Sequence, residues 1–509
     1  MAGTEPAGPA RATTPGGAGS PDGGDRSGPA GSPTDSPPEP SDDLVSTRHE
    51  IGSGRRKLSY TATTGRMVLR EEVIEEKKFL GPKPRAEIFS VSYVLDGADP
   101  HTRPVTFAFN GGPGSSSVWL HLGLFGPRRV QMADAGDLRP PPYGLTDNLE
   151  TLLVASDLVF IDPVSTGYSR TSQGHTADDF HGYTRDVESV AEFIRLWTSR
   201  NDRWLSPKFL AGESYGTTRA AALAAALADG PGMYLSGLIL VSSVLDIGSV
   251  DFTEGNDLPY ALYLPTYTAA AHYHGVIDGE LTARVAEAEE FAARDLPWAL
   301  ARGSRLRGAE RDAIVARYAQ LTGLDPGYVD RADLRVTLFA FCAELLRHRA
   351  LETGRLDLRF TGWPDDRNAG STTEDPSYRA LMGPYAAAFN SYVRGELGYS
   401  SDLAYRLLTP NVNPWSYAEF EGRSIEVATS LARAICANRT LRVHVSCGYY
   451  DGATPHFAAE HVFAHLRIPD SAHERIEWAR YEAGHMTYVH EPSRRRQSAD
   501  LIDFVRRSS

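Results

Sequence analysis

The chain has 509 residues, of which 41% are apolar and 23% are charged, a balance typical of a protein that folds around a sizeable core. Its formal net charge of −13 at pH 7 disfavours a nucleic-acid partner, because a phosphate backbone is bound by clustered lysines and arginines. No apolar run approaches the roughly 18 residues that a membrane-spanning helix requires, so no membrane association is expected.

The N-terminal segment consists mostly of Gly, Pro, Ala, Ser and Thr, with hardly any large apolar side chain. Such a segment cannot offset the entropy lost on ordering, so we expect residues 1–43 to form a disordered tail. No apolar signal segment follows Met1. The cysteines Cys342, Cys436 and Cys447 cannot form a closed disulfide framework and suit a reducing compartment. We therefore expect a cytoplasmic protein.

Residues 44–250 are expected to hold the first part of an α/β core. Alternating runs in Lys57–Thr61 and Arg66–Glu72 predict a hairpin that turns at Gly65. Short apolar runs separated by helical stretches then indicate a mostly parallel, twisted sheet with helices on both faces. The predicted strands are Ala86–Leu95, Pro104–Phe109, Leu158–Ile161, Phe209–Ala211 and Leu238–Val241, and the predicted helices are Tyr183–Ser199 and Thr217–Ala228.

The segment of residues 251–425 is rich in Ala, Arg, Tyr and Glu at helical spacing, which predicts a helical insertion that forms a lid. Within it, His272 and His274 are expected on a helix face rather than in a metal site, because no cluster of cysteines or carboxylates accompanies them. Neither a metal nor a cofactor is expected.

Residues 426–509 are expected to return to the core. They predict two strands, Val443–Ser446 and Ile476–Tyr481, and a final helix over Ser498–Arg507. The basic run Arg494–Arg496 at the opening of this helix is expected to be a solvated face.

The strongest motif is Gly212-Glu213-Ser214-Tyr215-Gly216, which follows an apolar strand and precedes an alanine-rich helix. A serine held in a sharp strand-to-helix turn needs glycines on both sides, because side chains there would collide with neighbouring backbone. A plain strand-to-helix connection is the alternative, since short matches of this kind also arise by chance. The context favours a nucleophile elbow in which Ser214 is the nucleophile.

A serine hydroxyl is a weak nucleophile until a base takes its proton and an acid orients that base. In the α/β-hydrolase fold these residues follow in the order serine, acid, histidine. Asp451 lies in a glycine-bounded loop after one predicted strand, and His485 follows the last predicted strand. Each alone is also compatible with an ordinary loop residue. Their joint order and placement predict a catalytic triad of Ser214, Asp451 and His485.

A glycine-rich loop, NGGPGSSS over Asn110–Ser117, directly follows the predicted strand Pro104–Phe109. Such a loop brings a backbone N–H close to a reacting carbonyl, so we assign the oxyanion hole to the amides of Gly112 and Tyr215. Nucleotide binding is the alternative for a glycine-rich loop. It is disfavoured because the Lys-Ser/Thr ending of a P-loop and the spacing of a dinucleotide loop are both missing.

Together these motifs resemble the serine carboxypeptidases, peptidase family S10, and especially its bacterial members. The matching stretches occur in the family's order and are Asn110–Ser117, Asp162–Ser169, Gly212–Gly216, Gly448–Asp451 and Gly484–Met486. The resemblance implies an α/β-hydrolase fold with a helical insertion over the site. It also implies removal of a C-terminal residue from a peptide substrate through an acyl-enzyme on Ser214.

The resemblance further implies which residues bind the substrate. Asn110 and Glu213 are expected to contact its carboxylate, with Gly111 beside them in the loop. Met486 adjoins His485 and matches the family, so it is expected to line the pocket, with core packing as the alternative. Trp119 has the same two interpretations.

Four positions depart from the family pattern. Leu124 stands where the family has the glutamate that pairs with the residue at Glu213, and Ala108 replaces a tryptophan. Ser115 replaces a cysteine, and Tyr488 replaces a proline. In the family two close carboxylates share a proton and so bind a carboxylate at acid pH. Here Glu213 either finds another partner or sits ionised and repels a substrate carboxylate.

The leading interpretation is a serine-type carboxypeptidase. An esterase, amidase or acyltransferase has the same triad and differs in admitting a substrate without a free carboxylate. An inactive hydrolase-fold binding protein is least favoured, because no triad member is missing. The sequence does not set the oligomeric state, and a homodimer stays among the alternatives.

Overall fold

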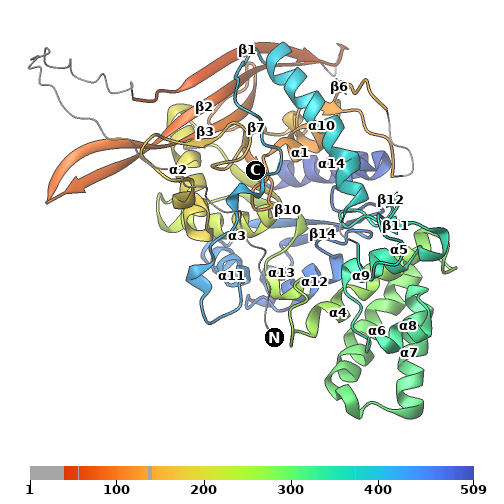
Figure 1. The fold of residues 1–509 in the computed structure, drawn as a ribbon. Coiled ribbons are helices and arrows are strands. Elements are labelled where there is room, and N and C mark those ends of the chain that lie inside the picture. Colours follow the sequence, from red (N-terminus) through yellow and green to blue (C-terminus); the bar gives the residue numbers. More distant parts are fainter. Residues whose placement is uncertain (1–38, 55–56, 136–139, 373) are drawn as a thin grey trace, which may run out of the picture. The chain divides into compact units, whose positions relative to one another are not determined.

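A ten-stranded sheet is the scaffold of the described chain, which comprises residues 39–54, 57–135, 140–372 and 374–509 of this computed structural model (Figure 1). The strand order is β1-β2-β3-β7-β4-β9-β10-β13-β14, and β8 pairs with β3. The strands are β1 (Asp43–Ile51), β2 (Leu58–Glu75), β3 (Lys78–Leu95), β4 (Val105–Phe109), β7 (Asp157–Ile161), β8 (Arg170–Thr171), β9 (Lys208–Ser214), β10 (Gly237–Ser243), β13 (Arg442–Gly448) and β14 (Ile476–Tyr481).

From β7 to β14 every pairing along this path is parallel, whereas β1, β2, β3 and β7 pair antiparallel. A mostly parallel sheet extended by antiparallel strands, with helices packed on it, is the α/β-hydrolase fold that the sequence predicted. Two further strand pairs lie outside this sheet, β5 (Arg128–Val130) with β6 (Leu145–Asp147) and β11 (Glu352–Thr353) with β12 (Thr361–Gly362).

The N-terminal strands differ from the prediction. Gly65 lies inside β2 rather than in a turn, and the chain reverses at Glu76 and Lys77, which both have a positive φ. Strand β1 was not predicted, and its residue Asp43 passes over Gly65. A Cβ at Gly65 would lie 1.9 Å from the carbonyl oxygen of Asp43, so this glycine serves a close backbone approach. The predicted disordered tail lies outside the described residues as far as residue 38.

Both faces of the sheet are covered, because successive side chains of its buried strands enter opposite cores. In β10, for example, Leu238 and Leu240 join one apolar cluster while Ile239 and Val241 join the other. Helices α2 (Tyr183–Arg200), α3 (Tyr215–Asp229), α11 (Ala428–Ala437) and α12 (His456–Ala464) cover the first cluster; α1 (Val118–Leu120), α10 (Pro376–Gly395) and α14 (Glu491–Ser508) cover the second. A short helix, α13 (Asp470–His473), precedes β14.

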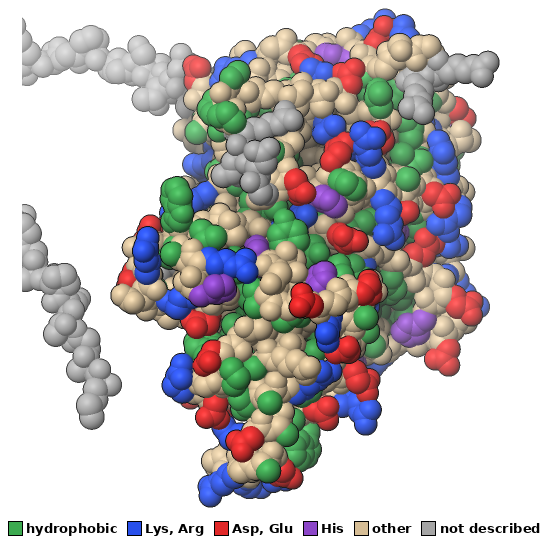
Figure 2. All heavy atoms as spheres, turned by 90° about the vertical axis from the view of Figure 1, so that its right-hand side faces the viewer, with side chains coloured by type: hydrophobic (Ala, Val, Ile, Leu, Met, Phe, Trp, Pro, Cys, Tyr) green, Lys and Arg blue, Asp and Glu red, His purple; other side chains and the backbone are tan. Residues whose placement is uncertain are grey.

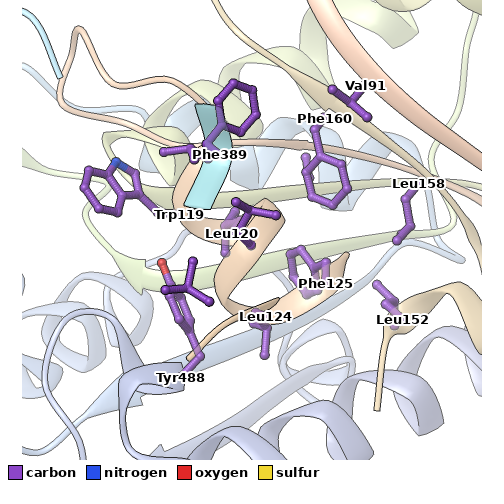
Figure 3. Close-up of a cluster of buried hydrophobic side chains, with 14 of the residues drawn as sticks. Val91, Trp119, Leu120, Leu124, Phe125, Leu152, Leu158, Phe160, Phe389 and Tyr488 are labelled. Carbon is purple, nitrogen blue, oxygen red and sulfur yellow. The ribbon is translucent and has the colours of Figure 1, made fainter. Parts of the chain in front are cut away.

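The second cluster contains the position that departs most from the family pattern. Leu124 is buried in a one-turn π-helix over His121–Phe125, among Leu120, Phe125 and the ring of Tyr488 (Figure 3). An ionised carboxylate in this apolar surrounding would carry a large desolvation cost. The leucine therefore belongs to the apolar core.

Residues 251–375 are mainly helical and have an apolar core of their own, which includes Phe291, Tyr318 and Phe341. Acidic and basic side chains are interspersed on the face that Figure 2 shows. The helices of this segment are α4 (Leu258–Leu262), α5 (Leu264–Tyr273), α6 (Leu281–Arg302), α7 (Gly308–Thr322), α8 (Pro326–Arg331) and α9 (Leu338–Glu344).

His272 and His274 each bond a backbone carbonyl. Their Nε2 atoms lie 2.9 Å from the oxygen of Gly279 and 2.7 Å from that of Leu358, respectively. Across the described ranges, no group of three or more His, Cys, Asp and Glu side chains is arranged to hold a metal ion. Among the described helices, none combines the length and apolar character needed to cross a bilayer.

The basic run in the last helix is only partly a solvated face, contrary to the prediction. The α14 helix begins at Glu491, and Arg494 is buried, with its guanidinium donating to Glu491 at 2.9 Å and to Glu150 at 3.2 Å. Arg495 and Arg496 are exposed. A buried arginine is tolerated because carboxylates compensate its charge, and sequence spacing alone does not reveal such partners.

Candidate active site

Ser214 occupies a strained turn between β9 and α3. It is the last residue of the strand and immediately precedes the helix, and its φ of 60° and ψ of −130° are rarely adopted by a non-glycine residue. The flanking glycines make this turn feasible. A Cβ on Gly212 would lie 2.1 Å from the carbonyl oxygen of Gly216, and one on Gly216 would lie 2.8 Å from that of Phe109. The predicted elbow geometry is therefore present.

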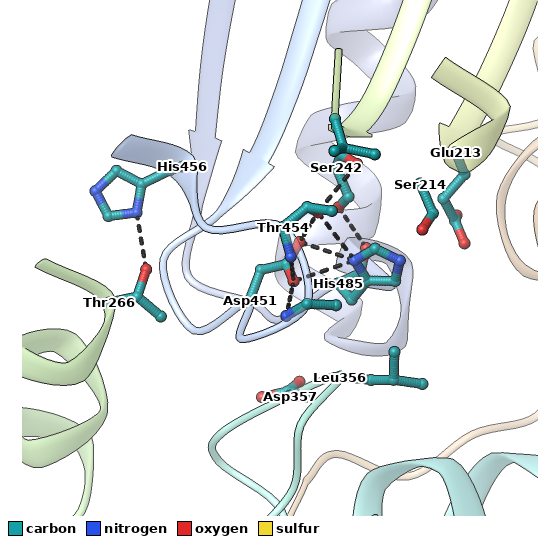
Figure 4. A network of polar contacts seen from close by, with 12 residues as sticks. Glu213, Ser214, Ser242, Thr266, Leu356, Asp357, Asp451, Thr454, His456 and His485 are labelled. Atoms are coloured by element: carbon teal, nitrogen blue, oxygen red, sulfur yellow. Dashed lines mark hydrogen bonds and ion pairs between the residues drawn. The ribbon is translucent and has the colours of Figure 1, made fainter. Parts of the chain in front are cut away.

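His485 is held by Asp451 on one side of its ring. The Nδ1 of His485 lies 2.9 Å from Oδ2 and 3.1 Å from Oδ1 of Asp451, and both residues are buried. Figure 4 shows the side chain of Ser214 on the side of the imidazole away from Asp451. The three residues, which are far apart in the chain, thus lie at or after the ends of strands β9, β13 and β14 of one sheet.

The carboxylate of Asp451 is itself fixed. Its Oδ1 accepts the N–H groups of Ala453 and Thr454 at 2.8 and 2.9 Å, and its Oδ2 accepts the hydroxyl of Thr454 at 2.8 Å. The peptide of His485 is held as well, since its N–H donates to Leu356 at 2.7 Å and its carbonyl accepts the hydroxyl of Ser242 at 2.6 Å. The imidazole is therefore oriented from the acid side and from its own backbone.

The charges of this pair shift the pKa of the histidine. Burial by itself lowers the pKa of His485, but the carboxylate of Asp451, with a smaller contribution from Glu213, raises it above its ordinary value of 6.5. The guanidinium of Arg355 acts weakly in the opposite direction. A raised pKa makes the imidazole a better proton acceptor.

Glu213 forms its hydrogen bonds with an amide and a phenol rather than with a second carboxyl group. Its Oε1 accepts Nδ2 of Asn110 at 2.9 Å, and its Oε2 accepts the hydroxyl of Tyr488 at 2.7 Å. Burial raises the pKa of Glu213 to about 7, although the His485 charge and the two donors each lower it. Of the two outcomes that the sequence left open, the structure therefore has the first: Tyr488 supplies the missing partner.

The glycine-rich loop lies directly against the elbow. A Cβ on Gly111 would lie 2.4 Å from the backbone nitrogen of Tyr215, so only glycine allows this approach. Gly112, with a φ of 105°, lines the pocket, and Tyr215 is the first residue of α3, where helix N–H groups have no intrahelical partner. The two amides assigned to the oxyanion hole thus lie on adjacent segments beside Ser214.

These groups line a pocket of about 600 Å³. Asn110, Gly111, Gly112, Glu213, Ser214, His485 and Met486 form its sheet side, together with Trp119. The other side comes from the insertion and the segment after it, with Phe339, Arg355, Leu356, Asp375, Tyr378 and Leu408 among the lining residues. Met486 and Trp119 are largely buried and also line this pocket.

Sequence reasoning missed several residues that support this site. Tyr488 had a signal, since it departs from the family's proline, but its bond to Glu213 depends on a contact between segments 275 residues apart. Arg219 had none. It is buried, it pairs with Asp186 at 2.7 Å, and it donates to the carbonyl of Asn110 at 2.6 Å, which fixes the base of the loop.

The sheet order and the elbow define the class of protein as an α/β-hydrolase. Comparison with known proteins gives the family: the model of the serine carboxypeptidase family (peptidase S10) matches residues 92–481, and the chain belongs to this family.

Curated relatives match shorter parts. The mouse lysosomal protective protein is 29% identical over 194 residues, which cover 38% of this chain and 36% of that protein. The Arabidopsis thaliana serine carboxypeptidase-like 44 is 34% identical over 124 residues, 23% of each chain. The match thus spans about a third of the mouse protein's length and less of the plant protein's.

Among solved structures, similarity extends over most of the chain at low identity. Proline iminopeptidase from Mycobacterium smegmatis has a TM-score of 0.35 and 14% identity, and the match covers 83% of this chain and 95% of that one. An esterase from Exiguobacterium antarcticum has a TM-score of 0.35 and 12% identity, with 82% and 96% covered.

Proposed function

We propose that the protein is a serine-type carboxypeptidase that releases the C-terminal residue of a peptide through an acyl-enzyme on Ser214. Membership of the S10 family supports the class of reaction. The observation that carries the mechanism is the imidazole of His485, held by Asp451 at 2.9 Å and turned with its other side toward Ser214 (Figure 4). This is the arrangement required for a serine to be activated by a base.

In the proposed reaction, Nε2 of His485 takes the proton of the Ser214 hydroxyl as Oγ attacks the scissile carbonyl carbon. The backbone N–H groups of Gly112 and Tyr215 donate to the oxygen that becomes negatively charged. The imidazolium, stabilised by Asp451, then returns the proton to the departing amine. A water molecule activated by the same imidazole hydrolyses the ester on Ser214 and restores the hydroxyl.

Substrate recognition is assigned to the groups beside the elbow. A protonated Glu213 donates a hydrogen bond to the carboxylate of the peptide, and Asn110 and the amide of Gly111 lie next to it. Met486 contributes an apolar wall. The helices and loops of residues 251–425 act as a lid in this proposal, because they supply the far wall of the pocket.

The test is the variant Ser214→Ala. We expect kcat on a blocked dipeptide with a free carboxylate to fall by about 10⁶-fold, with only the residual catalysis of the oxyanion hole left. A serine-directed phosphonate should label the native protein and leave the variant unlabelled. Full activity in the variant, or native protein that does not label, would refute the mechanism.

A second candidate keeps the triad and changes the substrate to an ester or amide without a free carboxylate. The replacement of the family's second glutamate by the buried Leu124 favours it. Comparing free-acid, amidated and esterified forms of one peptide separates the two, since indifference to the terminal carboxylate supports the esterase or amidase. Cytoplasmic location and oligomeric state stay predictions, to be checked by cell fractionation and by light scattering.

A further inference from the structure

Arg355 lines the same pocket as Ser214 and His485 but has no role in the reaction described above. It belongs to the loop between β11 and β12, in the insertion, and its side chain is half-buried. The insertion therefore contributes the guanidinium of Arg355 to the pocket, together with the carboxyl groups of Glu374 and Asp375.

The backbone around Arg355 is anchored at both ends. The N–H of Arg355 donates to Oδ1 of Asp375 at 2.9 Å, and the N–H of Leu356 donates to Oδ2 at 3.2 Å. On the other side, the carbonyl of Leu356 accepts the N–H of His485 at 2.7 Å. The arginine thus projects from a segment whose position relative to the imidazole is fixed by hydrogen bonds, as a binding group should be.

The guanidinium itself makes no hydrogen bond or ion pair with any residue in the described part of the chain. Neighbouring arginines behave differently. Arg359 donates to Asp357 at 2.7 Å, and Arg347 donates to Glu344 at 2.6 Å. The two carboxylates that line the same pocket are engaged elsewhere, since Glu374 pairs with Arg379 at 3.0 Å and Asp375 accepts the backbone N–H groups of Arg355 and Leu356. A guanidinium that is partly withdrawn from water and makes no ion pair carries a desolvation cost, which an anionic ligand would offset.

The guanidinium of Arg355 is also placed to bind an anion near Ser214 and His485. Arg355 is close enough to His485 to lower the pKa of the imidazole. Its effect is smaller than that of burial, which also lowers this pKa, and smaller than that of Asp451, which raises it. Glu213, which is bonded to Asn110 at 2.9 Å, has to be protonated before it can donate a hydrogen bond to a substrate carboxylate. A guanidinium requires no such proton, because it is charged at every physiological pH and forms paired hydrogen bonds with a carboxylate.

We propose that the guanidinium of Arg355 binds a carboxylate of the substrate and makes a negative charge next to the scissile bond a condition of efficient cleavage. The inference rests on the proposed function, because it places the substrate in the pocket of Ser214. The carboxylate has two sources, the terminal carboxylate of a free peptide and the side chain of an aspartate or glutamate, and the recognition chemistry is the same for both.

The experiment compares Arg355→Gln and Arg355→Lys with the native protein on four substrates. The parent substrate is a blocked dipeptide with uncharged side chains, one of them a glutamine beside the scissile bond, as the free acid. The other three are its amide, the same amide with glutamate in place of that glutamine, and an uncharged methyl ester. Arg355→Gln should lower kcat/KM by about 10- to 100-fold on the carboxylate substrates, mainly through KM, and by less than about twofold on the ester. Whichever acid is affected identifies the source. Arg355→Lys should recover part of the loss.

The matched control is Arg294→Gln, which removes an exposed arginine of α6 that pairs with Glu290 in the same insertion. It should leave all four substrates unchanged. An equal loss on charged and uncharged substrates would assign Arg355 a structural role, and no loss on either acid would show that it binds no carboxylate. Both results overturn the inference.

Binding measured without turnover separates this inference from the proposed function. In a Ser214→Ala background, titration calorimetry with the free acids and their amides should show at least about tenfold tighter binding of a carboxylate form, and Arg355→Gln should abolish that difference. If the native protein cleaves none of the peptides but this difference is found, the proposed function fails, whereas the binding of a carboxylate by Arg355 is supported. Equal binding of acids and amides would overturn the inference even if cleavage is observed.

Discussion

The pocket has two walls of different origin. The sheet wall is built from the ends of β9, β13 and β14 and holds Ser214, Asp451 and His485 in positions fixed by backbone geometry. The insertion wall comes from the segment around Arg355 and Asp375, which is positioned by side-chain bonds between loops and helix caps. The sheet wall thus contains the proposed triad, and the insertion wall contains Arg355.

This difference between the walls predicts which substitutions each of them tolerates. At the sheet wall the main chain itself is constrained, since Ser214 has a φ of 60° and Gly212 has no room for a Cβ. On the insertion wall the anchoring groups are a few side chains, so a single substitution is expected to alter binding without abolishing the chemistry. Three predictions probe this contrast, in order of expected effect.

The largest effect is expected from Asp451→Asn. The neutral amide cannot stabilise the imidazolium. Its NH₂ group can donate to Nδ1 of His485, which favours the tautomer that has its proton on Nε2 and cannot accept the serine proton. We therefore expect kcat to fall by about 10³- to 10⁴-fold while KM changes little. Steady-state kinetics on the free-acid dipeptide measures this. Asp503→Asn, on the exposed face of α14, is the control and should be neutral. A loss below about tenfold would show that the carboxylate does not act through His485.

A smaller effect is expected from Asp375→Ala on the insertion wall. This change removes the acceptor for the N–H groups of Arg355 and Leu356 and the N-cap of α10. The free energy of unfolding should drop by about 1–3 kcal/mol, and KM should rise about tenfold with a smaller change in kcat.

The matched control for that variant is Asp325→Ala, which removes the N-cap of α8 in the same insertion without touching the pocket. It should lower stability by a comparable amount and leave KM unchanged. Chemical denaturation and steady-state kinetics on both variants give the comparison. An unchanged KM in Asp375→Ala would mean that the anchoring of Arg355 does not matter for binding.

The smallest effect is a shift in pH dependence. Cleavage of a free acid should weaken at low pH, because His485 must be neutral to act as a base. The raised pKa of His485 shifts this acidic limb of the pH profile to higher pH. It should weaken again above about pH 7, the pKa of Glu213, because the ionised carboxylate repels that of the substrate. The amidated peptide should lack the alkaline limb, as should Glu213→Gln with either substrate.

Tyr488→Phe sharpens the same prediction. The hydroxyl of Tyr488 lowers the pKa of Glu213, so its removal should raise that pKa and move the alkaline limb upward by about one pH unit. Profiles of kcat/KM against pH for acid and amide measure this. Identical profiles for the two substrates would show that Glu213 does not meet the substrate carboxylate.

Much of the sheet could be predicted from the sequence because its strands are continuous apolar runs. The predicted strands Leu238–Val241 and Ile476–Tyr481 are found as β10 and β14, and the helix expected over Thr217–Ala228 is α3. The predicted strand Ala86–Leu95 lies within β3, but the pairing of the N-terminal strands could not be predicted correctly. Their alternating pattern is compatible with several pairings, and Gly65 looks like a turn residue until the passing backbone of Asp43 is known.

The sequence by itself determined the class of fold, the family resemblance and the identity of the residues at the elbow, because a strained turn and strand-end loops impose local requirements that short motifs record. Only the tertiary structure decided what surrounds them. The bond of Tyr488 to Glu213, the burial of Arg494 and the place of Arg355 in the pocket all depend on contacts between distant segments. A side chain's charge and type are local properties, whereas its partners and its exposure to water are properties of the packed chain.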